Sequence, residues 1–164
     1  MIGHHYSSTL TGWREWVSLS DIGVPWVKAK IDTGAQTSAL HATEISEFER
    51  DGAPWVRFVA HPWQLSDEDP VAVELPVHDR RIVRSSSGHA QERPVVLVAV
   101  DFVGRRISAE FTLTDRDGMQ FRMLIGREAL RQGYVVDSAA SFLGGKPPKH
   151  VRRRNRARGV ESPN

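Results

Sequence analysis

Bulky and polar residues alternate along much of the chain, in short runs separated by turn residues. The clearest runs span residues 13–19, 25–31, 55–60, 71–77, 95–102, 107–113 and 134–136. Alternation with a period of two is typical of half-buried β-strands, because successive side chains of a strand point to opposite faces of the sheet. Short strands at such regular spacing predict an all-β protein built on a closed sheet.

The first two runs predict a β-hairpin, because residues 20–23 supply turn chemistry between them. In the second run Val27 and Ile31 share one face, while Lys28 lies on the other. One side of this hairpin is therefore expected to face a core and the other to face solvent. The hairpin delivers Asp32 at its end.

Two segments have no clear period of two. Residues 40–48 fit either a short helix or a strand followed by a turn, because their apolar positions are too few to fix a period. Residues 128–132 predict one or two helical turns that end at Gly133.

Composition divides the chain into three parts. A chain of 164 residues with 40% hydrophobic content can bury one core, which predicts one domain, over residues 12–145. Residues 1–11 are expected to form a flexible N-terminus. Residues 146–164 lack apolar periodicity and are expected to form a basic disordered tail. Seven Lys and Arg against one Glu give this tail a charge of +6, so the other residues carry −4 of the overall +2.

The chain has no Cys, which excludes disulfides and thiolate metal ligands and fits a reducing compartment. No run approaches the roughly 20 apolar residues that a membrane helix needs. Residues 1–11 also lack the basic and apolar regions of a signal peptide. We therefore expect a soluble, cytoplasmic protein with no membrane partner.

The candidate chemistry begins at Asp32-Thr33-Gly34-Ala35, directly after an apolar strand. This order places a carboxylate on a turn, and glycine accepts backbone angles that other residues avoid. The following Ala35 lets another backbone pack closely. About ninety residues downstream, Ile125-Gly126-Arg127 forms a second motif, in which a glycine permits close passage of the chain.

Together the two motifs resemble the retropepsin-like aspartic peptidases. With Gly12-Trp13 and with Val83-Arg84-Ser85-Ser86 before Gly88, the pattern is similar to a bacterial, RimB-like branch labelled "ATP-dependent zinc protease". That branch is associated with an ATP-grasp glutamate ligase, which adds glutamates to a ribosomal protein. The resemblance covers roughly residues 12–145. It implies a closed acid-protease barrel with one short helix after the Ile-Gly-Arg segment.

The resemblance also implies roles for the motif residues. Asp32 would be catalytic, Thr33 would bond across a dimer, and Gly34 would lie against the substrate. Ala35 would pack beneath the loop, and Gly126 would pass behind it. Arg127 would pair with an acid that follows the Asp-Thr-Gly-Ala motif, but this chain has Gln36-Thr37 there, so its partner is left open.

A water-attacking aspartic peptidase needs two close carboxylates that share one proton. The alternatives within the chain are Asp115, Asp117 and Asp137, and none has an Asp-Thr/Ser-Gly turn. The second carboxylate is therefore expected from a second copy of the chain, so that Asp32 faces Asp32 across a twofold axis.

Between the motifs, residues 78–94 are polar at their centre and are the candidate flap over the substrate. The flanking runs, residues 71–77 and 95–102, are expected to pair. The candidate flap and substrate residues are Arg80, Arg81, Arg84, Ser85, Ser86 and Gly88. The three arginines suit an acidic or glutamylated peptide substrate. The alternative is an ordinary exposed hairpin that the arginines keep soluble.

Two other functions remain open on sequence alone. A zinc peptidase would need a motif such as His-Glu-x-x-His, and the nearest approach, at residues 41–44, lacks the second His. No phosphate-binding Gly-x-x-x-x-Gly-Lys-Ser/Thr loop is present, so we expect no metal and no other cofactor. A non-catalytic module would instead bind RNA or ribosomes through its tail, and would need residues 152–158 rather than Asp32.

Overall fold

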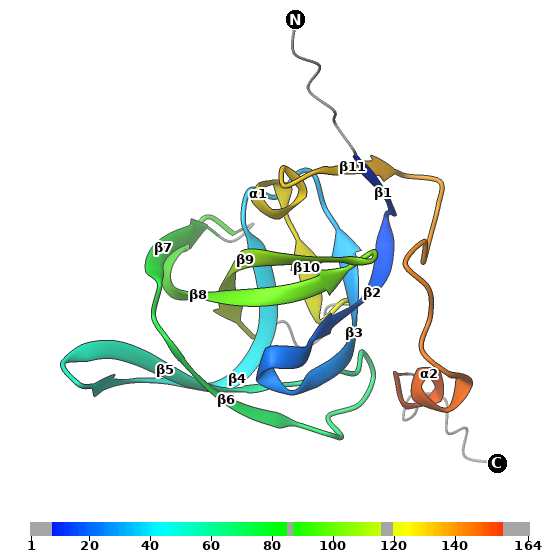
Figure 1. Ribbon diagram of the computed structural model, residues 1–164. Helices are drawn as coiled ribbons and strands as arrows, with labels where there is room; N and C mark the ends of the chain where they lie inside the picture. The colour runs from blue at the N-terminus through cyan, green and yellow to red at the C-terminus, as the bar shows by residue number, and fades with distance from the viewer. Residues whose placement is uncertain (1–7, 85–86, 116–119, 156–164) are drawn as a thin grey trace, which may run out of the picture.

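The computed structural model describes residues 8–84, 87–115 and 120–155, and within them the chain is mostly β-structure (Figure 1). The strands are β1 (Thr9–Gly12), β2 (Arg14–Leu19), β3 (Val24–Ile31), β4 (Ser38–Arg50), β5 (Ala53–Ala60), β6 (Val71–Pro76), β7 (Asp79–Arg84), β8 (Ala90–Phe102), β9 (Arg105–Thr114), β10 (Met123–Ile125) and β11 (Tyr134–Asp137). A 3-10 turn at Ser20–Ile22 and two helices, α1 (Arg127–Leu130) and α2 (Lys149–Asn155), complete the described elements.

Six strands pair in a closed ring, in the order β10, β3, β2, β8, β9, β4 and back to β10. Strand β10 closes this ring, because Met123 pairs with Ala29 of β3 on one side and with Leu40 of β4 on the other. Strands β5 and β6 continue the sheet beyond β4, and β1 pairs separately with β11. The ring carries the loop between β3 and β4 at one of its ends.

The core lies on the apolar face of these strands. In β3, Val27, Ala29 and Ile31 are buried while Lys30 is exposed, which confirms the predicted alternation. Burying each large apolar side chain contributes about 1.5–3 kcal/mol. The largest fully buried apolar side chains are Leu19, Leu40, Phe58, Phe102, Phe111, Leu113, Met123 and Ile125.

Residues 40–48 belong to a strand of 13 residues, so the helix alternative for them is wrong. The strand contains a register irregularity between Thr43 and Ser46, where Glu44 takes a left-handed φ of 52°. An irregularity of this kind inserts a residue and shifts the alternation. It explains why the apolar positions fit no single period.

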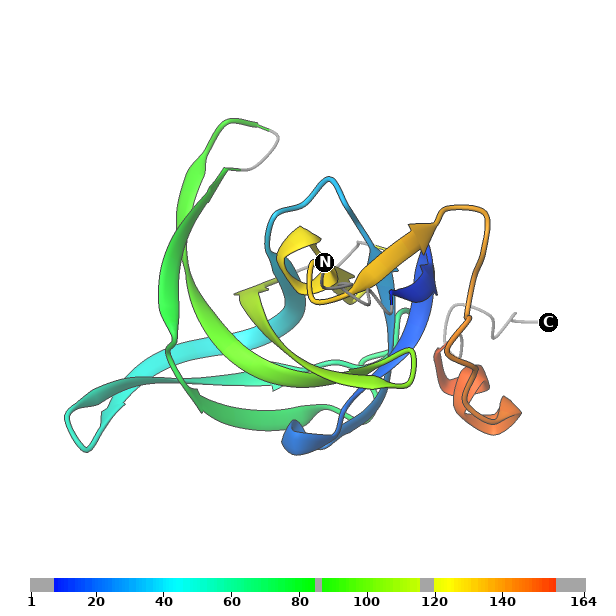
Figure 2. The ribbon, with the colours of Figure 1, turned by 45° about the horizontal axis from the view of Figure 1, so that its top comes forward.

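The predicted pairing of residues 71–77 with residues 95–102 is also wrong. Strand β6 pairs with β5, whereas residues 95–102 of β8 pair with β9. The first part of β8 pairs with β7 instead, from Ala90 opposite Arg84 to Val95 opposite Asp79. This β7–β8 hairpin and the β3–β4 loop project from the same end of the ring (Figure 2).

The prediction of a disordered tail is wrong for residues 149–155, which form α2. The buried Asn155 holds this helix to the loop after β5. Its Oδ1 accepts a hydrogen bond from the Gln64 N–H at 2.9 Å, and its Nδ2 donates to Gln64 Oε1 at 2.6 Å. Residues 156–164 lie outside the described part. No helix among the described residues is long and apolar enough to cross a bilayer.

Candidate active site

Asp32 follows the last residue of β3, and backbone hydrogen bonds hold it. Its N–H donates to the Ile125 carbonyl at 2.8 Å, and its Oδ1 accepts a hydrogen bond from the Gly34 N–H at 2.8 Å. A Cβ on Gly34 would lie 3.1 Å from that Oδ1, and Gly34 does not take a left-handed φ. The glycine therefore allows close approach to the carboxylate, and it does not serve, as expected, to supply special backbone angles.

Gly126 lies directly behind this loop. A Cβ at this position would lie 2.8 Å from the Ala35 carbonyl oxygen and 2.9 Å from the Thr37 carbonyl group. The Gly126 N–H donates to Ser38 Oγ at 3.0 Å, at the start of β4. The loop and the chain that crosses behind it therefore pack backbone against backbone, which only glycine allows here.

Arg127, whose partner the sequence leaves open, donates to backbone carbonyl groups of the loop. Its Nη1 donates to the Thr33 carbonyl at 3.1 Å and to the Gly34 carbonyl at 3.2 Å. Its backbone N–H donates to the Ala35 carbonyl at 2.7 Å. Arg127 thus fixes two carbonyls at the tip of the loop, although positions 36 and 37 carry no acid.

Gln36 and Glu128 add a further tie between this loop and α1. The Glu128 N–H donates to the Gln36 carbonyl at 3.1 Å, and Gln36 Nε2 donates to Glu128 Oε1 at 3.2 Å. Residue 36, where an acid was expected, therefore contacts an acid on the neighbouring helix. The loop is held at its tip, middle and far end before any ligand binds.

The tip of the loop is exposed beside apolar surface. Thr33 and Gly34 are exposed, and Thr33 lines a pocket of ≈ 330 Å³ with Leu130 and Tyr134. On the neighbouring β1–β11 pair, Leu10 and Val135 lie opposite each other and are 49% and 51% exposed. This pair adjoins Tyr134 and Val136, which line the pocket beside Thr33.

The β7–β8 hairpin and the loop enclose a second pocket of ≈ 440 Å³. Its lining residues come from the loop and β4, from β7, and from neighbouring strands: Ala35, Gln36, Thr37, Ala39, Arg81, Ile82, Val83, Arg84, Arg93, Thr112 and Leu124. The structure thus brings the candidate flap next to the loop of Asp32. Of the three arginines singled out in the sequence, Arg81 and Arg84 line this pocket and Arg80 does not.

Arg81 ties the hairpin to the rest of the site. It pairs with Glu110 on β9, and its Nη1 donates to Thr37 Oγ1 at 2.9 Å and lies 3.6 Å from Glu128 Oε2. The hydrogen bond from Arg81 holds the pKa of Glu110 below its ordinary value, although burial acts in the opposite sense. Burial lowers the pKa of Arg81, but the hydrogen bond and ion pair with Glu110 outweigh it and raise the pKa overall.

The remaining flap residues have other surroundings. Arg80 pairs with Glu47 of β4, outside the pocket. Arg84 lies 3.5 Å from the Gly88 carbonyl, and Gly88 takes a left-handed φ of 85° in the turn. Arg84 and Arg93 have no carboxylate partner among the described residues, so they leave the pocket positively charged. Ser85 and Ser86 lie outside the described residues.

Glu110→Gln tests the link between Arg81 and β9. Because the pKa of Glu110 is lowered from 4.5 in the folded protein, its contribution to stability is present above pH 4.5 and is lost as pH falls through the lower folded value. We expect the substitution to reduce the free energy of unfolding by about 1–2 kcal/mol at about pH 7, and by much less at about pH 3. Urea denaturation at the two pH values measures this.

Glu49→Gln is the matched control, because Glu49 is exposed on β4 and has no described partner. Its effect should be small at both pH values. An equal loss for Glu110→Gln at both pH values would show that the ion pair with Arg81 contributes nothing.

The other aspartates considered as catalytic partners have contacts elsewhere. Asp115 Oδ1 lies 3.7 Å from the His41 Nδ1 atom, and Asp137 Oδ1 accepts a hydrogen bond from the Ala139 N–H at 2.9 Å. Asp117 lies outside the described residues. Within residues 8–84, 87–115 and 120–155, no three His, Asp or Glu side chains gather as metal ligands.

Asp32 thus lies on a loop that the Gly126-Arg127 segment supports from behind. Residues 10–147 match the family model of the RimB-like, retropepsin-like aspartic endopeptidases. The chain belongs to this family of retropepsin-like aspartic endopeptidases.

The curated relatives are longer proteins. The chain is 42% identical over 137 residues to a protein from Shewanella pealeana and 39% identical over 140 residues to one from Desulfotalea psychrophila, both named probable alpha-L-glutamate ligase. These matches cover 84% and 85% of this chain but 30% of each relative. The chain thus spans about 30% of the length of the curated relatives it matches.

A crystal structure from Legionella pneumophila supports the fold. It is of a protein of unknown function, with a TM-score of 0.70 and 27% identity, and the match covers 84% of this chain and 99% of that one. Together with the family match, this likeness makes the ring of six strands part of a retropepsin-like fold.

Proposed function

We propose that this protein is an endopeptidase that works as a homodimer, with the Asp32 carboxylates of two copies holding one water between them. The observation that carries the proposal is the preorganised loop of Asp32, with its tip exposed and with one such loop in each chain. A twofold axis at the tip supplies the second carboxylate by symmetry.

In this arrangement the two carboxylates share one proton, because two like charges so close cannot both be ionised. The ionised Asp32 takes a proton from the water as its oxygen attacks the peptide carbonyl carbon. The protonated Asp32 of the second copy gives its proton to the carbonyl oxygen. As the C–N bond breaks, the first Asp32 gives the proton it took from water to the leaving nitrogen. The second Asp32 takes a proton from a hydroxyl group of the tetrahedral intermediate, which becomes the product carboxyl group, and the starting state is restored.

The surface around the loop tip suits a second copy. Leu10 and Val135 form an exposed apolar pair, and the pocket beside Thr33 offers a recess next to it. An isologous interface places the same patch on both sides of the axis, so apolar surface meets apolar surface.

We therefore expect activity to depend on dimer concentration. The specific rate of peptide cleavage should fall on dilution through the dissociation range that sedimentation velocity measures. Leu10→Lys should shift that range to higher concentration by about tenfold or more, because it places like charges on both sides of the axis. Leu97→Lys, at a residue that is 46% exposed on β8, is the control. Full activity of a strictly monomeric protein would contradict the dimer.

For the substrate, we propose an acidic or glutamylated peptide. Arg84 and Arg93 leave the pocket under the hairpin positively charged, and an acidic chain would be attracted there. The names of the curated relatives, probable alpha-L-glutamate ligases, point in the same direction and support a functional link to a ligase of that kind.

The test incubates the pure protein with matched peptides that carry neutral, aspartate-rich or glutamate-rich tails, and reads cleavage by mass spectrometry. We expect the glutamate-rich peptide to be cleaved fastest, and Arg84→Gln with Arg93→Gln to remove most of that preference. Arg80→Gln, outside the pocket, should leave this preference unchanged.

Peptide cleavage should persist in a strong chelator, because the proposed mechanism uses no metal. Loss on chelation that zinc alone restores would favour a zinc mechanism instead.

A further inference from the structure

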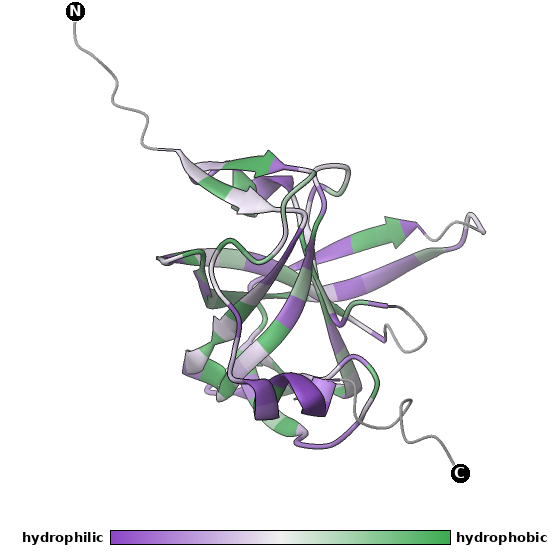
Figure 3. Cartoon of the chain, turned by 90° about the vertical axis from the view of Figure 1, so that its right-hand side faces the viewer, coloured by the Kyte–Doolittle hydropathy of each residue, from purple (hydrophilic) through white to green (hydrophobic). Residues whose placement is uncertain are grey.

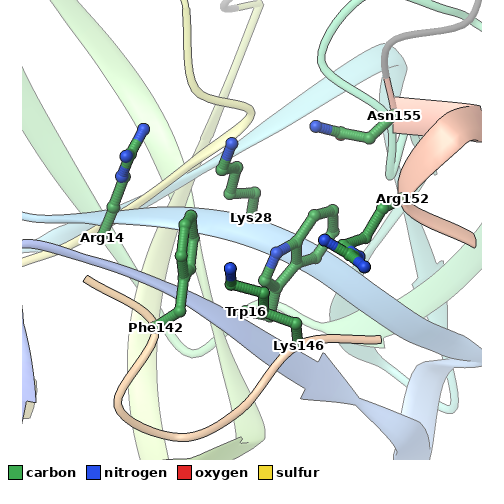
Figure 4. A pocket seen from close by; sticks show the side chains of 7 residues that line it. All are labelled: Arg14, Trp16, Lys28, Phe142, Lys146, Arg152 and Asn155. Atoms are coloured by element: carbon green, nitrogen blue, oxygen red, sulfur yellow. The ribbon is translucent and has the colours of Figure 1, made fainter. Parts of the chain in front are cut away.

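A third pocket lies apart from the loop of Asp32, against the outer face of β2 and β3 (Figure 4). Its volume is ≈ 250 Å³. The lining side chains come from β2, β3, the segment after β11 and helix α2: Arg14, Trp16, Lys28, Phe142, Lys146, Arg152 and Asn155. None of them lines the pocket under the β7–β8 hairpin. The two sites therefore share no residue.

The pocket is strongly cationic. Four of its lining residues are Lys or Arg, and no carboxylate lines it among the described residues. Three of these cations gather around the ring of Phe142, at 4.8 Å for Arg14, 5.2 Å for Lys28 and 5.4 Å for Lys146. The ring attracts each cation, but the cations repel one another, so an anion between them would be stabilised.

The fold holds the walls of this pocket in place. The Phe142 N–H donates to the Arg14 carbonyl at 3.0 Å, and Arg14 Nε donates to Ser141 Oγ at 3.1 Å. The buried Glu15 accepts the N–H groups of Leu143 and Gly144, each at 3.0 Å. The segment that carries Phe142 is thus fixed to β2 before any ligand arrives.

Arg152 supplies a second, independent sign of a ligand. Its Nε atom is buried and has no hydrogen-bond acceptor among the described residues. A buried donor without an acceptor destabilises the fold, and a bound oxyanion would remove this cost. Figure 4 shows the Arg152 side chain reaching from α2 toward Trp16, on the wall of the same pocket.

We propose that this pocket binds a polyvalent phosphate, either a free one or the terminal phosphate of a larger molecule. A phosphate group carries up to two charges and three acceptor oxygens, which suits several converging donors better than one carboxylate does. A pocket of ≈ 250 Å³ is large enough for a phosphate group but too small for a nucleic-acid duplex. Because cations already cover the Phe142 ring, the pocket recognises the anion and not a stacked base.

The test is isothermal titration of inorganic pyrophosphate into the full-length protein at low salt. Lys146→Gln and Arg152→Gln should each weaken binding about tenfold, because each removes a charged donor. The matched controls are Lys149→Gln and Arg153→Gln, which remove the same charges from exposed positions outside the pocket. They should change the affinity less than about twofold. Circular dichroism checks that every variant is folded, and the exposed Lys146 keeps the test valid if Arg152→Gln unfolds.

Orthophosphate and a nucleoside 5′-monophosphate distinguish a free phosphate from a terminal one. If the nucleotide binds more tightly than orthophosphate, and only the pocket variants lose this difference, the ligand is a terminal phosphate. The reverse order would assign a free phosphate.

Equal weakening by the pocket variants and the controls would overturn the proposal, because it would show diffuse attraction to a basic surface. A tetraglutamate peptide that binds as tightly as pyrophosphate would overturn the phosphate class. Absence of pyrophosphate binding would overturn the site.

Discussion

Asp32→Asn should reduce peptide cleavage by at least about 10⁴-fold, because the general-base and general-acid steps both depend on this carboxyl group and each contributes about 10²–10⁴-fold. The amide keeps the size of the side chain, and its oxygen can still accept the Gly34 N–H. We therefore expect the variant to fold normally. It should also dimerise at least as tightly, because no charge remains at the twofold axis. Cleavage of the glutamate-rich peptide, followed by mass spectrometry, measures the loss.

A mixing experiment separates a shared site from two independent ones. Excess Asp32→Asn protein, added to the wild type, should suppress wild-type activity in proportion to the heterodimers formed, because each heterodimer holds one carboxylate. Asp51→Asn, in the exposed turn between β4 and β5, is the matched control and should neither lose activity nor suppress it. Near-wild-type cleavage by pure Asp32→Asn protein would show that Asp32 is only a turn residue.

The strands were predictable because alternation is a local property. Val27 and Ile31 lie on the core face of β3 because the pattern of residues 25–31 marks that face without reference to any other segment. The partner of a strand is a non-local property. Strand β8 is long enough to pair with β7 at one end and with β9 further along, and alternation marks its faces but not its partners.

Helix α2 escaped prediction for a different reason. It carries no apolar stripe, and its residues are almost uniformly hydrophilic (Figure 3). The helix is held by Asn155 against Gln64, a contact between residues 91 positions apart. Composition alone cannot distinguish such a docked polar helix from a solvated tail.

The sequence was sufficient to identify the aspartate and the two glycines of the candidate site. At Gly126 two backbones approach each other, and a Cβ there would lie 2.8 Å from the Ala35 carbonyl oxygen. At Gly34 a carboxylate approaches the backbone, and a Cβ there would lie 3.1 Å from Asp32 Oδ1. The contacts of Arg127 and Arg81 were not predictable in this way. Arg127 binds backbone carbonyls, and because every residue has one, the sequence does not show which carbonyl is the partner. Arg81 donates to Thr37 Oγ1, which is 44 positions away in the sequence, so only the fold brings the two together.

Glu15→Ala should lower the free energy of unfolding by about 3–5 kcal/mol, which is a large share of the stability of a domain of this size. Glu15 is fully buried, and its oxygens accept backbone N–H groups from Gly12 at 2.7 Å and from Leu143 and Gly144, each at 3.0 Å. Alanine removes the acceptor of all three donors; the bond from Gly12 is buried and those from Leu143 and Gly144 are partly buried. A buried donor left without an acceptor costs about 1–3 kcal/mol, and a partly buried one costs less because water can reach it. Urea denaturation measures the change.

Glu15→Gln sharpens the test, because it keeps the volume of the side chain. One carboxyl oxygen serves Gly12 and Leu143 and the other serves Gly144, so an amide nitrogen must face at least one backbone donor. The loss of stability should be intermediate between those of the wild type and Glu15→Ala. Glu49→Ala, at an exposed position of β4, should cost less than about 0.5 kcal/mol.

Since Leu143 adjoins Phe142, pyrophosphate affinity should fall in Glu15→Gln although Glu15 does not line the pocket. A loss for Glu15→Ala no larger than that of Glu49→Ala would show that this buried carboxyl group does not hold the C-terminal segment to β2.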